Sequence, residues 1–415
     1  MGSSRGHILI GTAIVILVVG AITVLPSFLP ADDERTATGT EEDRSGEGGD
    51  PSGSTSTEPT NDKAAKETTS TTTTAPARPP ANTLQMQKFT TITGSISPKS
   101  VVASGKGVVT AQNMMYTHTM TAYDKDGNLV ATVPDTVTLS DFGIDKPGQY
   151  QGAPVEAAFT HDGEHVYVSN YAMYGPGFRE GSDSCSPASN VPSSYLYRIS
   201  TTDWKIDQVA PVGATPKYVA VTPDDKRVLT TNWCTYDLSV TDAATGAEIK
   251  RIPMGRYPRG IAITPDGKTA FVAIMGSTNI ARVNLDDYSV SMISGVGQGP
   301  RHLVISPDGS TLYATLNSEG AVAKIDAASG AVIKKVKTGS QPRSMAISGD
   351  GTAVYVVNYD SSTISKLDTS DLHELQKLPS GHHPIGIAYD DSTGRVWEAN
   401  YSGSIVVYDE VAPTG

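Results

Sequence analysis

Short apolar runs separated by turn residues recur through most of the chain after about residue 84. The clearest copy is YPRGIAITPDGKTAFVAIMGSTNIARVNLDDYSVSMISGVGQG, residues 257–299. This pattern predicts four β-strands, the first two of which are joined by a turn at Pro265-Asp266-Gly267. A single sheet of four short strands cannot bury both of its faces, so the unit needs neighbours of the same kind.

The neighbouring copies follow at a regular spacing. A proline begins each copy, and in the second half of the chain these prolines stand forty-two residues apart, at Pro216, Pro258, Pro300, Pro342 and Pro384. Looser spacing adds copies at Pro98 and Pro154. A four-stranded repeat of this length is typical of a β-propeller, so the sequence predicts an all-β, seven-bladed propeller over residues 84–415.

The seventh copy contains only three predicted strands, which leaves its blade incomplete. The segment LQMQKFTTITG, residues 84–94, resembles the fourth strands of other copies, such as HELQKLPSG. We therefore predict that this N-terminal strand completes the last blade, which closes the ring and leaves no free sheet edge.

Two segments precede the repeats. Residues 8–25 carry no charge and are rich in Ile, Val and Leu, so residues 1–30 are predicted to be a cytoplasmic stub and a transmembrane helix. The acidic residues that follow favour a cytoplasmic N-terminus and a propeller outside the cell membrane. A cleaved signal peptide is the alternative. Residues 31–83 are rich in Ser, Thr, Pro and acidic residues and are predicted to be a disordered linker.

Charge and motifs narrow the possible functions. The net charge is −12, so nothing in the bulk charge suggests a nucleic-acid partner. The sequence has no CxxC, HExxH or phosphate-binding loop, and we expect no cofactor and assign no catalytic residue.

Two insertions interrupt the regular spacing, at residues 134–153 and 172–194. Both are predicted to lie side by side on the top face, defined as the face that carries the loops between second and third strands. Insertions gathered on one face of a repeat protein indicate its binding face, and the alternative is that they only decorate or plug the ring. Cys185 in the second insertion and Cys234 in the matching loop of the next blade are predicted to form a disulfide in an oxidising exterior.

The residue after the repeat proline is basic in five of the seven copies. These residues enter the innermost strands at the mouth of the channel, where they are candidates for binding a carboxylate or phosphate. The alternative is that each bonds backbone carbonyls of the next blade. The five candidates are Lys99, Lys217, Arg259, Arg301 and Arg343.

An asparagine followed by an aromatic residue ends the second strand of four copies. Aromatic faces and amides suit sugars or planar ligands, although such asparagines also cap their own turns. The candidates are Asn170, Tyr171, Asn232, Trp233, Asn358, Tyr359, Asn400 and Tyr401. Weaker candidates for a metal site are Glu156, His302 and His383, which come from different copies without a diagnostic spacing, so no metal is predicted.

The repeats PKYVAVTPDDKRVLTTN, PRSMAISGDGTAVYVVN and PIGIAYDDSTGRVWEAN resemble those of the YVTN-repeat β-propeller family, over residues 84–410. That family includes ligand binders, surface proteins and relatives of lactonases. The resulting hypothesis is a membrane-anchored extracytoplasmic propeller that binds a protein partner or a small anionic or sugar-like ligand on its top face. The alternatives are a lactonase-like hydrolase with an active site at the rim and a non-catalytic cell-surface scaffold.

Overall fold

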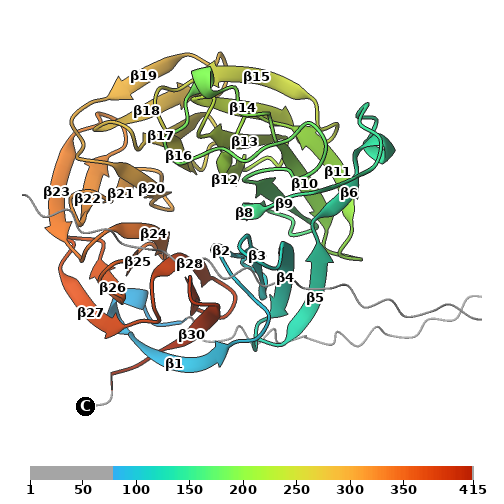
Figure 1. Ribbon diagram of the computed structural model, residues 1–415. Coiled ribbons are helices and arrows are strands. Elements are labelled where there is room, and N and C mark those ends of the chain that lie inside the picture. The colour runs from blue at the N-terminus through green and yellow to red at the C-terminus, as the bar shows by residue number, and fades with distance from the viewer. Residues whose placement is uncertain (1–77, 414–415) are drawn as a thin grey trace, which may run out of the picture. The chain divides into compact units, whose positions relative to one another are not determined.

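The computed structural model describes residues 78–413, which form seven four-stranded antiparallel sheets around a central axis (Figure 1). The predicted all-β, seven-bladed propeller is therefore confirmed. The predicted transmembrane helix and almost all of the predicted linker lie outside the described residues. Within residues 78–413 no helix is long and apolar enough to cross a membrane.

The strands of each blade follow one another from the axis outward. Blade one contains β2 (Ser100–Ala103), β3 (Val108–Asn113), β4 (Thr119–Asp124) and β5 (Leu129–Pro134). Blade two contains β8 (Pro154–Phe159), β9 (His165–Asn170), β10 (Tyr195–Ser200) and β11 (Ile206–Pro211). Blade three contains β12 (Pro216–Val221), β13 (Arg227–Asn232), β14 (Asp237–Asp242) and β15 (Glu248–Pro253).

The remaining four blades repeat this order. Blade four contains β16 (Pro258–Ile263), β17 (Thr269–Ile274), β18 (Asn279–Asn284) and β19 (Val290–Ile293). Blade five contains β20 (Pro300–Ile305), β21 (Thr311–Leu316), β22 (Ala321–Asp326) and β23 (Val332–Lys337). Blade six contains β24 (Pro342–Ile347), β25 (Ala353–Asn358), β26 (Thr363–Asp368) and β27 (Glu374–Pro379). Blade seven contains β28 (Pro384–Asp390), β29 (Arg395–Asn400), β30 (Ser404–Val411) and β1 (Gln85–Ile92).

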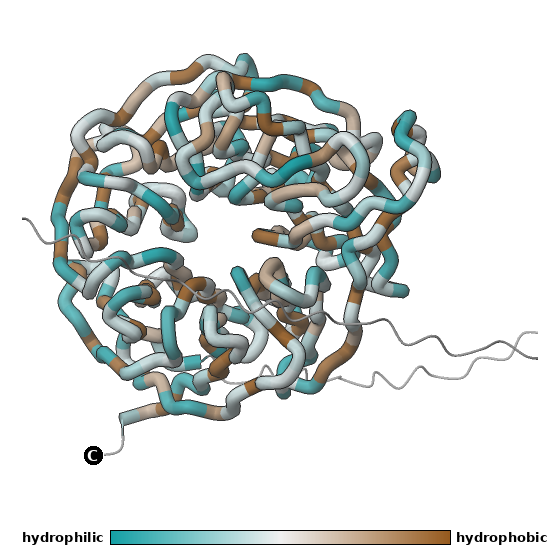
Figure 2. Tube along the Cα trace, in the orientation of Figure 1, coloured by the Kyte–Doolittle hydropathy of each residue, from teal (hydrophilic) through white to brown (hydrophobic). Residues whose placement is uncertain are grey.

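Each sheet is covered on both faces by its neighbours, and this explains the continuous apolar runs in the inner strands. All six residues of β25, AVYVVN, are buried, whereas nearly all of β23, on the outside of blade five, is exposed. Strands buried on both faces lose the alternation of a half-exposed strand. Hydrophobic segments accordingly recur in every blade (Figure 2).

The ring closes as predicted. Strand β1 pairs antiparallel with β30, from Gln85 opposite Val411 to Ile92 opposite Ile405. The N-terminal strand thus supplies the outer edge of the blade whose other three strands come from the end of the chain (Figure 1).

A basic side chain links neighbouring blades at one repeat position, twenty-four residues after the proline. In blade four, Nη2 of Arg282 donates to the carbonyl oxygens of Ala327 and Ala328, at 2.6 and 2.9 Å. In blade five, Nζ of Lys324 donates to two carbonyl oxygens in the turn of blade six, each at 2.8 Å. These contacts satisfy carbonyl groups in a turn that has no strand partner.

Lys366 holds the same position in blade six, but its partners are different because blade seven is completed on its outside by the N-terminal segment of the chain. Its Nζ donates to the carbonyl oxygens of Ala81 and Leu84, at 2.7 and 2.8 Å, and forms an ion pair with Glu410. The hydroxyl of Tyr355 also donates to Oε1 of Glu410, at 2.5 Å. Both charged side chains are fully buried, so the ring is closed around a buried ion pair.

We predict that Lys366→Met strongly destabilises the propeller because it leaves the Glu410 carboxylate buried without its cation. Removing one partner of a buried ion pair costs about 3–5 kcal/mol. The matched control is Lys324→Met at the same repeat position, which loses bonds to neutral carbonyls and leaves no charge unpaired, at about 1.5–3 kcal/mol. The free energy of unfolding in urea tests this, and equal losses in the two variants would contradict the proposed role of the ion pair.

The first insertion does not lie over the ring, which corrects the prediction. Its short strands β6 (Thr136–Thr138) and β7 (Gln149–Gln151) form a separate two-stranded sheet joined through the 3-10 helix η2 (Leu139–Phe142). Val137 and Leu139 pack with Tyr197 and Val209 of the outer strands of blade two. The insertion thus lies at the outer edge of this blade, beside β11 (Figure 1).

The second insertion crosses from blade two to the top of blade three, and it contains the 3-10 helix η3 (Pro187–Ser189). The predicted disulfide between Cys185 and Cys234 is confirmed, with Cα atoms 5.2 Å apart. Nε1 of Trp233 donates to the carbonyl oxygen of Asp183 at 3.1 Å. The two insertions are adjacent, as predicted, since backbone hydrogen bonds join residues 151 and 174.

Candidate functional site

The five basic residues predicted to converge all line one cavity, with a volume of about 530 Å³, at the top end of the central channel. Four of them are the second residues of innermost strands that begin with proline. Because blades two to seven share one register, the side chains at this position point toward the axis from different directions. The residues are Lys99, Lys217, Arg259, Arg301 and Arg343.

Three of these cations have no hydrogen-bond acceptor within residues 78–413. No described residue accepts a hydrogen bond from the side chain of Lys99, Arg259 or Arg301. Arg301 is only 5% exposed, and its Nη1 is buried without a partner among the described residues, as is Nε of Arg343. For these side chains the alternative prediction, bonds to carbonyls of the next blade, is therefore wrong.

The concentration of positive charge affects the ionisation of each group. Burial, followed by repulsion from Arg301 and Arg259, holds the pKa of Lys99 well below its usual range. Burial and then repulsion from Arg343 lower the pKa of Arg259 to about 10. Each shift means that burial and the neighbouring cations together disfavour the cationic form.

Lys217 differs from the other four cations because it is paired with an acidic residue of the protein. Its Nζ lies 4.1 Å from the ring centroid of Tyr171, 5.1 Å from that of Trp233 and 3.7 Å from a carboxylate oxygen of Asp183. Two aromatic faces and an acid stabilise this ammonium group. The predicted aromatic residues of blades two and three therefore hold a lysine of the protein itself.

The aromatic residues of blades six and seven complete the wall of the cavity, which Tyr359 and Tyr401 both line. The guanidinium of Arg343 lies 3.5 Å from the ring centroid of Tyr359. The ring of His383 stacks on the same tyrosine, at 4.2 Å and an interplanar angle of 10°. His383 thus supports the wall and lies apart from the other two metal candidates.

The four predicted asparagines do not line the cavity. Asn170, Asn232, Asn358 and Asn400 are fully buried. Nδ2 of Asn358, for example, donates to the hydroxyls of Thr363 and Ser365, each at 3.1 Å. Asn232 likewise donates within its own hairpin, whereas Asn170 donates to Tyr195 and Asn400 accepts from Ser380. The contacts of all four are thus internal to the protein, and the ligand-binding prediction for them is not supported by their placement.

A glycine in the crossover explains why the asparagines are inaccessible. A Cβ atom placed on Gly339 would lie 2.7 Å from Asn358, and one on Gly381 would lie 2.6 Å from Asn400. Only glycine allows the crossover to lie directly on the amide. In blade one the equivalent residue is Asn113, whose Nδ2 donates to Thr119 and Thr121.

Sequence reasoning missed several residues that line the cavity. Gln341, just before a repeat proline, accepts a hydrogen bond from Nη2 of Arg343 at 3.1 Å and has a positive φ of 51°. Glu180 and Asp183 come from the second insertion. Asp183 lies two residues before Cys185, and the predicted disulfide could have indicated that it lies near the top of blade three. The other missed residues are Met114, Met115, Met275 and Asn317.

Below the cations the channel narrows to a small space lined by Glu156 and His302. The hydroxyl of Tyr218 lies 3.3 Å from Nε2 of His302, and that of Ser344 lies 3.4 Å from Nδ1. Burial, aided by the nearby arginines, lowers the pKa of His302 to about 3, so this imidazole is neutral. Burial also raises the pKa of Glu156 to about 7. A second cavity of about 420 Å³ lies beneath.

The comparisons with known proteins agree with this fold. The family described as YNCE-like beta-propeller matches residues 193–377. The chain is a β-propeller of the YVTN-repeat type. Hydrazine synthase from Kuenenia stuttgartiensis superimposes on this YVTN-type propeller with a TM-score of 0.61 at 16% identity, over 78% of this chain and 98% of that chain. At this identity the similarity concerns the fold alone, and no curated protein sequence matches the chain.

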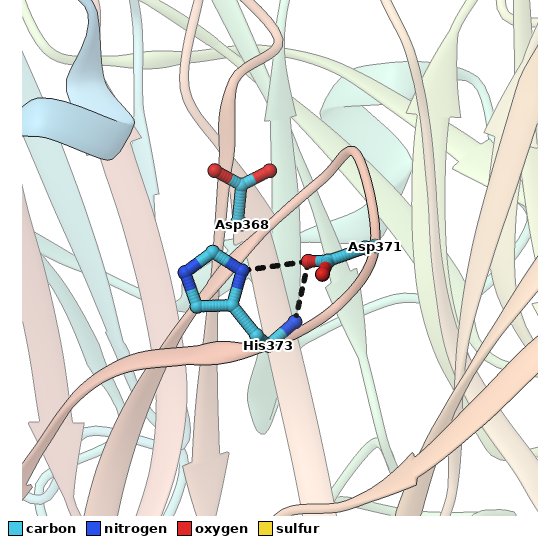
Figure 3. A group of neighbouring side chains, drawn as sticks. All are labelled: Asp368, Asp371 and His373. Atoms are coloured by element: carbon cyan, nitrogen blue, oxygen red, sulfur yellow. Dashed lines mark hydrogen bonds and ion pairs between the residues drawn. The ribbon is translucent and has the colours of Figure 1, made fainter.

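One group of metal-ligating residue types occurs on the outside of the YVTN-type propeller, in the turn between β26 and β27 (Figure 3). One ligand atom from each of Asp368, Asp371 and His373 lies within 4.8 Å of the others. Asp368 already accepts hydrogen bonds from Asn82 and Ser370, and Asp371 pairs with His373 at 2.6 Å. Since these contacts account for the carboxylates, the group is a hydrogen-bonded turn.

We predict that Glu156→Gln changes how stability depends on pH. Because the pKa of Glu156 rises from an ordinary 4.5 to about 7, the folded state binds this proton more tightly than the unfolded state. The side chain therefore destabilises the fold increasingly as pH rises from about 4.5 to 7, and fully above 7. The free energy of unfolding of Glu156→Gln is expected to exceed that of the wild type by about 1–3 kcal/mol at pH 8. Near pH 4.5 the two values should be equal.

The matched control is Glu164→Gln, which replaces an exposed acid in the same blade. Urea titrations at a series of pH values measure the difference. A constant offset for Glu156→Gln across the whole range would contradict the assignment.

Proposed function

We propose that this propeller binds a small anionic ligand in the cavity at the top end of its channel. The observation that carries the proposal is Arg301, a buried cation whose side chain has no hydrogen-bond acceptor among residues 78–413, together with the half-buried Lys99 and Arg259, which also lack one there. Burying an unpaired charge is costly, and the oxygens of an anion would supply the missing acceptors. Arginine can bind such oxygens with two parallel hydrogen bonds, which adds geometric specificity.

The shape of the site supports a small ligand rather than a protein partner. The second insertion reaches the rim with Glu180 and Asp183 but leaves a cavity of about 530 Å³. A concave space of this size with a few polar groups at its base suits a small molecule. A scaffold plugged by its insertions would have no such space, so the cavity favours the binding hypothesis.

The test of this proposal is the double substitution Arg301→Gln and Arg343→Gln. The change keeps side chains of similar length but removes both charges. Isothermal titration with sodium sulfate, phosphate, citrate and benzoate is expected to find an anion that binds the wild type. That affinity should fall about 10-fold or more, since hydrogen bonds to charged groups contribute roughly 1.5–3 kcal/mol.

The matched control is Arg251→Gln, which removes an arginine that pairs with Glu248 on the outer strand β15. It should leave anion affinity unchanged. Unchanged affinity in the double variant, or no binding by any anion to the wild type, would overturn the proposal.

We also propose that the propeller lies outside the cytoplasm, attached to the membrane through residues 8–25. The disulfide between Cys185 and Cys234 supports an oxidising compartment, and the uncharged run supports the attachment. Alkaline phosphatase fused after Gly415 should be active with the full chain and inactive when residues 1–30 are deleted. An inactive full-length fusion, or equal activity of both, would contradict this placement.

A further inference from the structure

We infer that the cavity selects a phosphate monoester, a dianionic tetrahedral group carried on an apolar or planar body, over a carboxylate. The inference rests on the proposed anion binding and goes further by naming the chemical class of the ligand. Three independent features of the site lead to it: the directions of the donors, the excess of charge and the surface of the upper wall.

The donors surround the axis. They come from one repeat position in blades one, three, four, five and six, and only blades two and seven present apolar residues there, Val155 and Ile385. A carboxylate presents two oxygens in one plane and can face donors on few sides at once. A phosphate group presents three strong acceptor oxygens in different directions. Donors distributed around most of a ring therefore match the tetrahedral group.

The charge of the site calls for more than one negative charge. Lys217 is compensated by Asp183 and two aromatic rings, which leaves Lys99, Arg259, Arg301 and Arg343 facing the cavity. Glu156, beneath them in the narrow part of the channel, and Glu180 at the rim compensate at most two of these four cations. A monoanion would leave like charges repelling one another in a buried site, whereas a dianion removes more of that repulsion.

The size of the cavity and its apolar upper wall indicate that the anionic group is attached to an organic ring or chain. A phosphate group has only a few times the volume of a water molecule, about 30 Å³, and fills little of a cavity of about 530 Å³. Above the cations the wall contains Tyr401, Met114, Met115 and Met275. Thioether and aromatic side chains provide an adaptable apolar surface for a ring or chain. The ester body would lie against this surface while the phosphate group lies among the arginines.

The experiment is isothermal titration of the full chain in detergent with phenyl phosphate, benzoate and inorganic phosphate. The first two share an aromatic ring and differ in the anionic group, and the third lacks the ring. Phenyl phosphate is expected to bind at least about 10-fold more tightly than either of the others. Arg259→Gln should weaken phenyl phosphate by a similar factor, and Arg251→Gln should not.

The possible outcomes distinguish this inference from the anion-binding proposal on which it rests. If none of the three anions binds, this inference is overturned, and the anion-binding proposal is overturned as well when sulfate and citrate also fail to bind. If benzoate binds as tightly as phenyl phosphate, anion binding stands and the tetrahedral selectivity is overturned. If inorganic phosphate binds as tightly as phenyl phosphate, the role of the wall is overturned. If a low melting temperature shows that Arg259→Gln folds poorly, Arg259→Lys tests the same contact. This variant keeps the positive charge but loses the paired N–H donors of the guanidinium.

Discussion

Closure of the ring depends on the contacts of Lys366. At this position blades four and five reach a turn of the next blade, which belongs to the same continuous stretch of chain. Blade six has to reach a segment almost three hundred residues away in sequence, and it does so with a buried ammonium, two carbonyls and the carboxylate of Glu410. Ordering so distant a segment costs loop entropy, so a strong set of contacts at this one seam is physically reasonable.

A closed ring also determines the geometry of the cavity. Because each blade repeats the register of the previous one, a residue type that recurs in sequence becomes a set of side chains related by rotation about the axis. The basic residues after the repeat prolines illustrate this, since their separation of forty-two residues along the chain becomes proximity at one end of the channel. The fold brings these cations together although their repulsion opposes it. Burial of the inner strands compensates for that cost.

The periodic features of this protein could be predicted from its sequence, and the departures from periodicity could not. The blades, the closing strand and the convergence of Arg259, Arg301 and Arg343 all follow from the repeat. The position of the first insertion does not, because Val137 and Leu139 carry no period that indicates which surface they cover. The asparagines show a different limit. A polar residue at the end of a strand can face a cavity or lie under a crossover. Which of the two occurs depends on whether a glycine of the crossover, forty or fewer residues away in sequence, packs against the residue.

The shared register of the innermost strands makes the base of the cavity modular. The residue after each repeat proline lies on a strand whose pairing and packing are set by other positions, so it can vary in one blade while the rest stay as they are. Blades two and seven, which present Val155 and Ile385, show that the fold accepts apolar residues there as well as charged ones. Seven separately variable positions around one axis would allow propellers of this architecture to acquire different ligand preferences without rebuilding the scaffold.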